Sequence, residues 1–231
     1  MTANTRGGSE GKALTPSAAA SNLRSQACYA KLLERIVRVD LAPGQRIIEE
    51  EMRNDMGFGA SPIREAIRRL EYEQLVVVYP RSGTYVAGID LKGARDLMQL
   101  RSAIEGTAAS LAGQHGSKHE REQLVALAEE QLKATELHAC VDLDAQFHHS
   151  VYTMSRNPYL IATARVHFNL ALRYWYFCVK EVSAPDWTAV DHTDLAHAIA
   201  EGRGSDASRD LQHHIVHDTQ SVIEILAGYG L

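Results

Sequence analysis

The stretch from Gly57 to Glu71 constrains the fold most, because a turn, a helix start and a periodic run of apolar residues follow one another there. Ser61 is a residue type that caps helix N-termini, and Pro62 suits the first helical turn, where a missing N–H group costs nothing. Apolar residues then recur at spacings of four and three, at Ile63, Ile67 and Leu70. This spacing places them on one face of a helix. We predict a helix that starts at Ser61 and packs this face inward.

Three arginines lie on the other flanks of this helix, at Arg64, Arg68 and Arg69. Because apolar side chains take the inner face, the guanidinium groups remain outside. Arginine binds phosphate oxygens and guanine edges through paired N–H donors. The pattern therefore predicts a DNA-recognition helix, with Ser61 and the three arginines at the DNA.

The preceding segment supplies the other helices of a helix-turn-helix. A first helix is expected from Ser21 or Asn22 up to the breaker Ala42-Pro43-Gly44. A second, short helix is expected from about Glu49 to Asp55, and Gly57 to Ala60 then form the turn.

The following segment predicts a β-hairpin. Two β-prone runs, Val76–Tyr79 and Thr84–Ala87, are joined by Pro80-Arg81-Ser82-Gly83. Such a hairpin lies beside the recognition helix in winged proteins, so Arg81 and Gly83 at its tip are expected at a phosphate or a minor groove. Residues 22–88 are thus predicted to form a winged helix-turn-helix.

These motifs resemble the N-terminal domain of GntR-type bacterial transcription regulators. The resemblance rests on Leu41-Ala42-Pro43-Gly44, on the run from Pro62 to Ile67 and on Arg81-Ser82-Gly83-Thr84-Tyr85-Val86. The C-terminal part resembles the FadR branch of that family, which carries an all-helical FCD effector domain. The resemblance implies a mostly α protein, in which residues 92–231 form a helical bundle for effector binding, metal binding and dimerisation.

One departure from the family pattern bears on DNA specificity. The family usually has a serine-arginine-threonine-proline run before the recognition helix, and here Gly59-Ala60-Ser61-Pro62 stands in its place. A base-reading arginine is therefore replaced by Ala60. The operator sequence should therefore not be inferred from those of relatives.

Composition agrees with two domains. The chain has 231 residues, 45% of them hydrophobic, and no apolar run long enough to span a membrane. Residues 1–21 are rich in Ala, Ser, Thr and Gly without a signal-peptide block, which predicts a disordered tail and a cytoplasmic protein. Three cysteines, Cys28, Cys140 and Cys178, are far apart and are expected to be reduced, mostly buried thiols.

Net charge is −5, which by itself speaks against a nucleic-acid partner. The two halves differ, however, because residues 1–90 carry 12 basic against 11 acidic side chains and the remainder 12 against 18. DNA binding must then rely on local arginine placement, with a homodimer doubling the phosphate contacts.

Histidines are confined to the C-terminal part, since all 11 lie after residue 114. Asp144 and His148 are spaced i and i+4, which puts them on one helical face. His192 and His214 are 22 residues apart with Arg203 midway in a breaker-rich segment. If that segment joins two antiparallel helices, both histidines lie at the same level.

One carboxylate and three imidazoles suit a divalent transition ion such as zinc, nickel or manganese, with zinc expected first. A buried, hydrogen-bonded histidine is the default alternative for any single position. The FCD resemblance implies metal, because its Asp-x3-His pair and two later histidines match Asp144, His148, His192 and His214. His213 or His217 could replace His214; we choose His214 because it precedes Ile215 as in the family.

Arg101 interrupts the apolar stripe Leu97, Ile104, Ala108 and Leu111 of a helix expected over residues 94–113. One interpretation is an internal ion pair with Glu105, one turn further on. The other follows from the resemblance, which implies that an arginine here holds the carboxylate of the effector beside the metal.

We therefore expect a homodimeric, DNA-binding transcription regulator, a repressor, whose operator affinity is controlled by a small carboxylic or sugar acid bound beside a divalent metal ion. One alternative is a metal sensor that needs no organic effector. The other is a metal-dependent enzyme, because three histidines and a carboxylate can activate water.

Overall fold

The computed structural model describes residues 16–182 and 191–230, which form two compact units. Of the described residues, the first unit comprises residues 16–34 and Arg46–Tyr85, and the second comprises Arg35–Gln45 and residues 86–182 and 191–230. In the described residues, no helix is long and apolar enough to cross a membrane.

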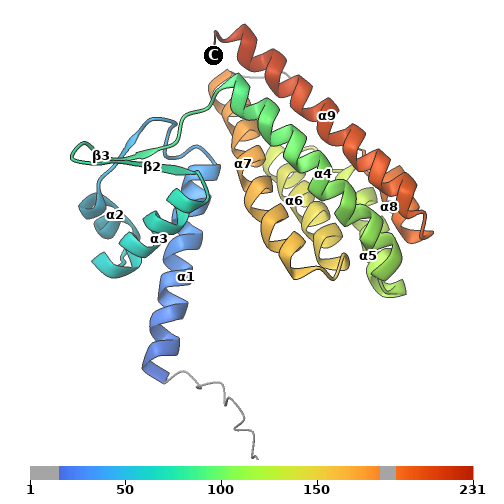
Figure 1. Cartoon of the computed structure of the whole chain (residues 1–231), viewed down its shortest axis with the longest axis horizontal. Coiled ribbons are helices and arrows are strands. Elements are labelled where there is room, and N and C mark those ends of the chain that lie inside the picture. Colours follow the sequence, from blue (N-terminus) through green and yellow to red (C-terminus); the bar gives the residue numbers. More distant parts are fainter. Residues whose placement is uncertain (1–15, 183–190, 231) are drawn as a thin grey trace, which may run out of the picture. The chain divides into compact units, whose positions relative to one another are not determined.

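The first unit has the expected winged helix-turn-helix, drawn in blue to blue-green in Figure 1. Its elements are α1 (Pro16–Val37), β1 (Arg46–Ile47), α2 (Glu49–Met56), α3 (Ala60–Tyr72), β2 (Val76–Tyr79) and β3 (Gly83–Val86). The sheet order is β1-β3-β2, and β1 runs antiparallel to β3 with Arg46 opposite Tyr85. The inner face of α3 is buried as predicted, at Ile63, Ala66, Ile67 and Leu70.

Two helix starts differ from the sequence predictions. Helix α1 begins at Pro16, not near Ser21 or Asn22, and the rest of the predicted tail, residues 1–15, lies outside the described residues. Helix α3 begins at Ala60, with extended Gly59 as the capping residue and no side-chain cap hydrogen bond. Ser61 is already helical, so it does not adopt the extended conformation that a capping residue needs.

The second unit is all-helical, as expected. Its helices are α4 (Leu91–His115), α5 (Lys118–Gln131), α6 (Leu137–Met154), α7 (Pro158–Val182), α8 (Thr193–Ala200) and α9 (Gly204–Gly228). Local signals set two of the starts: Asp90 accepts a hydrogen bond from the Gly93 N–H at 2.7 Å, and Ser117 forms a capping box with Glu120. The core draws on all six helices around Phe147, Tyr152, Phe168 and Leu211.

All three cysteines are buried free thiols, as the sequence indicated. Burial raises the pKa of the Cys178 thiol to about 11. The thiols are therefore kept protonated and behave as small apolar groups.

Helices α4 and α9 run side by side and approach closely through glycines (Figure 1). A Cβ atom on Gly113 would lie 3.3 Å from the Gly204 Cα atom, and one on Gly204 would lie 2.9 Å from the Ser110 carbonyl oxygen. This contact fixes the level at which residues of α4 meet residues of α9.

We predict that Gly204→Ala destabilises the protein by about 1–3 kcal/mol, because the added methyl group meets backbone that cannot rotate away. The matched control is Gly228→Ala on the same helix, where an added Cβ atom meets nothing within 4 Å. Denaturant unfolding of both variants measures the difference. Equal stability of the two would show that α4 and α9 separate at little cost.

Candidate functional site

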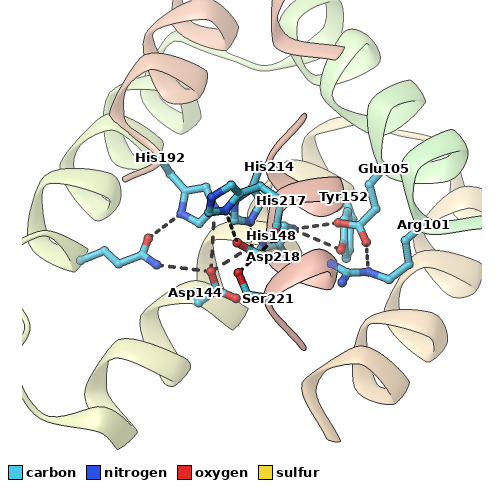
Figure 2. A network of polar contacts seen from close by, with 11 residues as sticks. Arg101, Glu105, Asp144, His148, Tyr152, His192, His214, His217, Asp218 and Ser221 are labelled. Carbon is cyan, nitrogen blue, oxygen red and sulfur yellow. Dashed lines mark hydrogen bonds and ion pairs between the residues drawn. The ribbon is translucent and has the colours of Figure 1, made fainter. Parts of the chain in front are cut away.

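Four side chains converge inside the second unit (Figure 2): Asp144 and His148 on α6, His192 just before α8, and His214 on α9. One potential ligand atom of each lies within 4.8 Å of the others. The Nε2 atoms of His192 and His214 are 3.1 Å apart. The Asp144 Oδ1 atom is 3.9 Å from His148 Nε2 and 3.8 Å from His192 Nε2.

Helical spacing positions Asp144 and His148, and a turn between two helices positions His192 and His214. Asp144 and His148 share a face of α6 because they are one turn apart. His192 caps α8, and Gly202 in the left-handed conformation (φ 75°) lets the chain turn from α8 into α9. The two-helix turn that the sequence suggested therefore brings His192 opposite His214, although His192 precedes the helix instead of lying inside it.

Outer partners hold two of the imidazoles through Nδ1. His148 Nδ1 is 2.8 Å from the Glu105 carboxylate, and His192 Nδ1 is 2.8 Å from the Gln131 side-chain carbonyl. The Gln131 amide also donates to Asp144 at 3.3 Å, so one side chain orients two members of the cluster. Carboxylate and carbonyl acceptors on Nδ1 leave Nε2 facing the centre, as in protein metal sites.

The imidazoles of His192 and His214 are held neutral. Burial lowers the pKa of both well below the usual value; the charge of His148 lowers the pKa of His192 further, and His192 and His148 lower that of His214 further. A neutral imidazole has a nitrogen lone pair available for a metal ion.

The alternative ligands lie elsewhere. His213 and His217 are exposed, whereas His148 and His192 are buried. The part of the chain that the structure describes thus places His214, and neither of its neighbours, at the centre.

Arg101 is buried and forms an ion pair with Glu105, its Nε atom lying 2.5 Å from Oε1. Burial alone would raise the pKa of Glu105, but Arg101 and the hydrogen bond from His148 outweigh it and lower the pKa to about 2. Glu105 is therefore an anion that links Arg101 to His148. The internal pair considered from the sequence is present.

The space beside Arg101 is small. A cavity of about 20 Å³ is lined by Arg101 and by residues of α4, α7 and α9, among them Tyr174 and Thr219. Such a volume holds about one water molecule. An organic acid would need side chains to move before it could reach the guanidinium group.

Two polar residues of the centre, Gln131 and Asp218, escaped sequence reasoning, as did the contact of Glu105 with His148. Asp218 Oδ2 lies 3.2 Å from His214 Nε2. Burial, and next the charge of Asp144, raise the pKa of Asp218 to about 7. The i, i+4 spacing of His214 and Asp218 was a usable signal, whereas Gln131 has no local pattern that points to the site.

In the first unit, the predicted DNA-binding residues differ in the contacts that their side chains make within the protein. Arg64 Nε contacts Glu49 Oε2 at 2.9 Å, and Arg68 is exposed on the same helix. Arg69 contacts residues of its own unit, with Nε 3.0 Å from the buried Glu73 carboxylate and its guanidinium carbon 3.5 Å above the Tyr29 ring, although 53% of its side chain is exposed. These contacts give Arg69 a role in holding α3 against α1.

The hairpin tip and the helix start complete this surface. Arg81 is exposed in the left-handed conformation (φ 67°), and Gly83 (φ 123°) has a conformation that favours glycine. A Cβ atom on Gly83 would lie 3.0 Å from Arg46 Nε, so glycine also makes room for the Arg46 side chain. Ser61 is exposed near the start of α3.

Comparison with known proteins supports the same division. Residues 24–86 match the family described as bacterial regulatory proteins, gntR family, and residues 96–217 match the FCD domain. An uncharacterized HTH-type transcriptional regulator of Streptomyces ambofaciens is 28% identical over 75% of this chain and 74% of its own. The HTH-type transcriptional repressor RspR of Escherichia coli is 26% identical over 87% of this chain and 90% of its own.

Among solved structures, E. coli McbR/YncC has the same fold, with a TM-score of 0.71 and 16% identity over 89% of this chain and 98% of its own. The gntR family and these relatives are transcription regulators, so the alternative of a metal-dependent enzyme is set aside. The chain belongs to the GntR family of DNA-binding transcription regulators and carries an FCD domain.

Proposed function

We propose that this regulator is a homodimeric repressor whose operator affinity is controlled by a small organic acid, bound beside a divalent metal ion. The observation that carries the proposal is the convergence of Asp144, His148, His192 and His214 with their potential ligand atoms within 4.8 Å of one another. Repression is supported by two relatives that are named transcriptional repressors, RspR and GlaR of E. coli.

The donor set fits a transition ion. Three imidazole nitrogens and one carboxylate oxygen are ligands that zinc, nickel and manganese accept. Metal–ligand bonds of about 2.0–2.2 Å allow two donors of one ion to lie up to about 4 Å apart, and three donor pairs, at 3.1, 3.8 and 3.9 Å, fall within that limit. When bound, the ion would supply a Lewis-acidic position for an oxygen of the acid.

Arg101 is the residue we propose for the carboxylate of the acid. Its planar guanidinium group can bind a carboxylate through two hydrogen bonds. It already forms an ion pair with Glu105, which in turn accepts from His148. A bound acid would therefore replace Glu105 at the Arg101 guanidinium group or share that group with it. Either change would alter the hydrogen bond between Glu105 and the metal ligand His148.

The DNA-binding part of the proposal uses α3 and the hairpin. The residues proposed to face the DNA are Ser61, Arg64 and Arg68 on α3, together with Arg81 and Gly83 at the hairpin tip. Arg69 contributes through packing. A dimer presents two such surfaces to two half-sites about one helical turn apart. The acid changes affinity only if it binds two arrangements of the dimer differently.

A metal sensor without an organic effector is the second candidate. It is favoured by the cavity of about 20 Å³ beside Arg101 and by the existing ion pair of that arginine. In that case the ion alone changes DNA affinity.

For DNA binding, we predict that Arg64→Ala weakens affinity by about 1–3 kcal/mol for an operator selected by the wild-type protein from random duplexes. The expected loss arises because one arginine contact to a base or phosphate disappears. Arg209→Ala, at an exposed position of α9, is the control and should bind like wild type. Equal affinity of both variants would remove Arg64 from the interface.

For the effector, we predict that one of a panel of carboxylic and sugar acids raises the melting temperature by several degrees, since saturation at a hundred times Kd adds about 2.7 kcal/mol. A chelator and His192→Ala should abolish the shift, whereas His197→Ala, an exposed neighbour, should keep it. Stabilisation by metal with every acid silent would favour the sensor. A shift that survives both chelator and His192→Ala would contradict a metal-dependent site.

For the metal, we predict that Gln131→Leu weakens binding about 10–100-fold, because an outer partner that orients two ligands is lost. Gln123→Leu, at an exposed position of the same helix, is the control. Titration with nickel or zinc against a competing chelator provides the affinities. Unchanged affinity in Gln131→Leu would show that the ligands hold their orientation without the amide.

A further inference from the structure

Asp218 is a largely buried carboxylate, one helical turn beyond His214 on α9, with 16% of its side chain exposed. Its Oδ2 atom lies 3.2 Å from the Nε2 atom of His214. Figure 2 shows Asp218 among the converging side chains. It is not one of the four ligands in the proposed function.

The nitrogen of His214 that Asp218 contacts distinguishes a metal ligand from an orienting partner. Glu105 and Gln131 each contact the Nδ1 atom of a histidine, on the side turned away from the centre. Asp218 contacts Nε2 of His214, the same atom that lies 3.1 Å from His192 Nε2. Asp218 therefore approaches the centre from the inside, where a ligand belongs, and not from the outside, where an orienting partner belongs.

The carboxylate charges at the centre also support a ligand role for Asp218. Glu105 is paired with Arg101 at 2.5 Å, whereas Asp144 and Asp218 each lie within 4 Å of a histidine Nε2 atom of the centre. A buried carboxylate is stabilised as an anion by a paired cation or a coordinated metal ion, and otherwise takes up a proton. One divalent ion would balance these two carboxylates.

We infer that Asp218 is a fifth ligand of the metal ion, so that the centre consists of three imidazoles and two carboxylates. The inference rests on the proposed metal function and extends it. Five protein donors exceed the four of most zinc sites, whereas imidazole suits nickel and carboxylate suits manganese. The centre should therefore prefer an ion of higher coordination number, and an organic acid would compete with Asp218 for the ion.

The test uses the full-length protein with Co²⁺ and Ni²⁺ as probes. Wild type, Asp218→Asn and Asp218→Ala are titrated against a chelating dye, and the visible absorption of the Co²⁺ form is recorded. We expect the variants to bind about tenfold or more weakly, since even outer partners contribute that much. The Co²⁺ absorption should become stronger, because fewer ligands give more intense bands. Asp210→Asn on the same helix is the control and should match wild type in both readouts.

Three outcomes would overturn the inference, and they differ in what they say about the metal. If wild type binds no ion, the proposed metal centre fails together with Asp218. If wild type binds ions and the Asp218 variants match it in affinity and spectrum, the four-ligand centre stands and only the fifth ligand is rejected. Weaker binding with an unchanged Co²⁺ spectrum would make Asp218 an orienting partner instead of a ligand. Asp218→Asn keeps the size of the side chain and guards against loss of folding.

Discussion

The buried carboxylate of Glu105 is the group on which the polar centre of the helical unit depends. One oxygen accepts from Arg101 and the other from His148, so a charge on α4 is tied to a potential metal ligand on α6. Neither partner tolerates loss of this anion, because an uncompensated buried guanidinium is strongly destabilising. The pair lies on the helix that packs against α9 through Gly113 and Gly204, and α9 carries His214 and Asp218. The packing of α4 against α9 therefore also sets the positions of the polar residues of the site.

Much of the fold follows from local sequence patterns. Apolar spacing predicted the inner face of α3, and the turn predicted at Gly57 marks the end of α2 in the structure. The start of α3 was misplaced by one residue, because Ser61 is a good capping residue by type while the extended backbone occurs at Gly59. Strand β1 has only two residues, Arg46 and Ile47, too few for any periodicity to reveal. Its pairing with β3 is a tertiary contact.

In the candidate site, too, residues related by local spacing were predictable and residues joined by tertiary contacts were not. Asp144 and His148 are one turn apart, and His192 and His214 flank a glycine-containing turn, so four positions were accessible from spacing and from the family resemblance. Gln131 was not, since its contacts join the end of α5 to groups 13 and 61 residues away. For Arg69, the sequence indicated an outward flank, and 53% of the side chain is exposed, but its contacts with the buried Glu73 and with the Tyr29 ring were not apparent from the sequence. Local spacing does not reveal which charged neighbour is buried.

The division into two units, each with its own buried side chains, has a consequence for cooperativity. Two cores that unfold separately give two transitions, and a ligand stabilises only the transition of the unit to which it binds. DNA should therefore raise the stability of the winged unit, and an ion that of the helical unit. Any rise in one transition caused by a ligand of the other unit would be a direct measure, in free energy, of the communication between them.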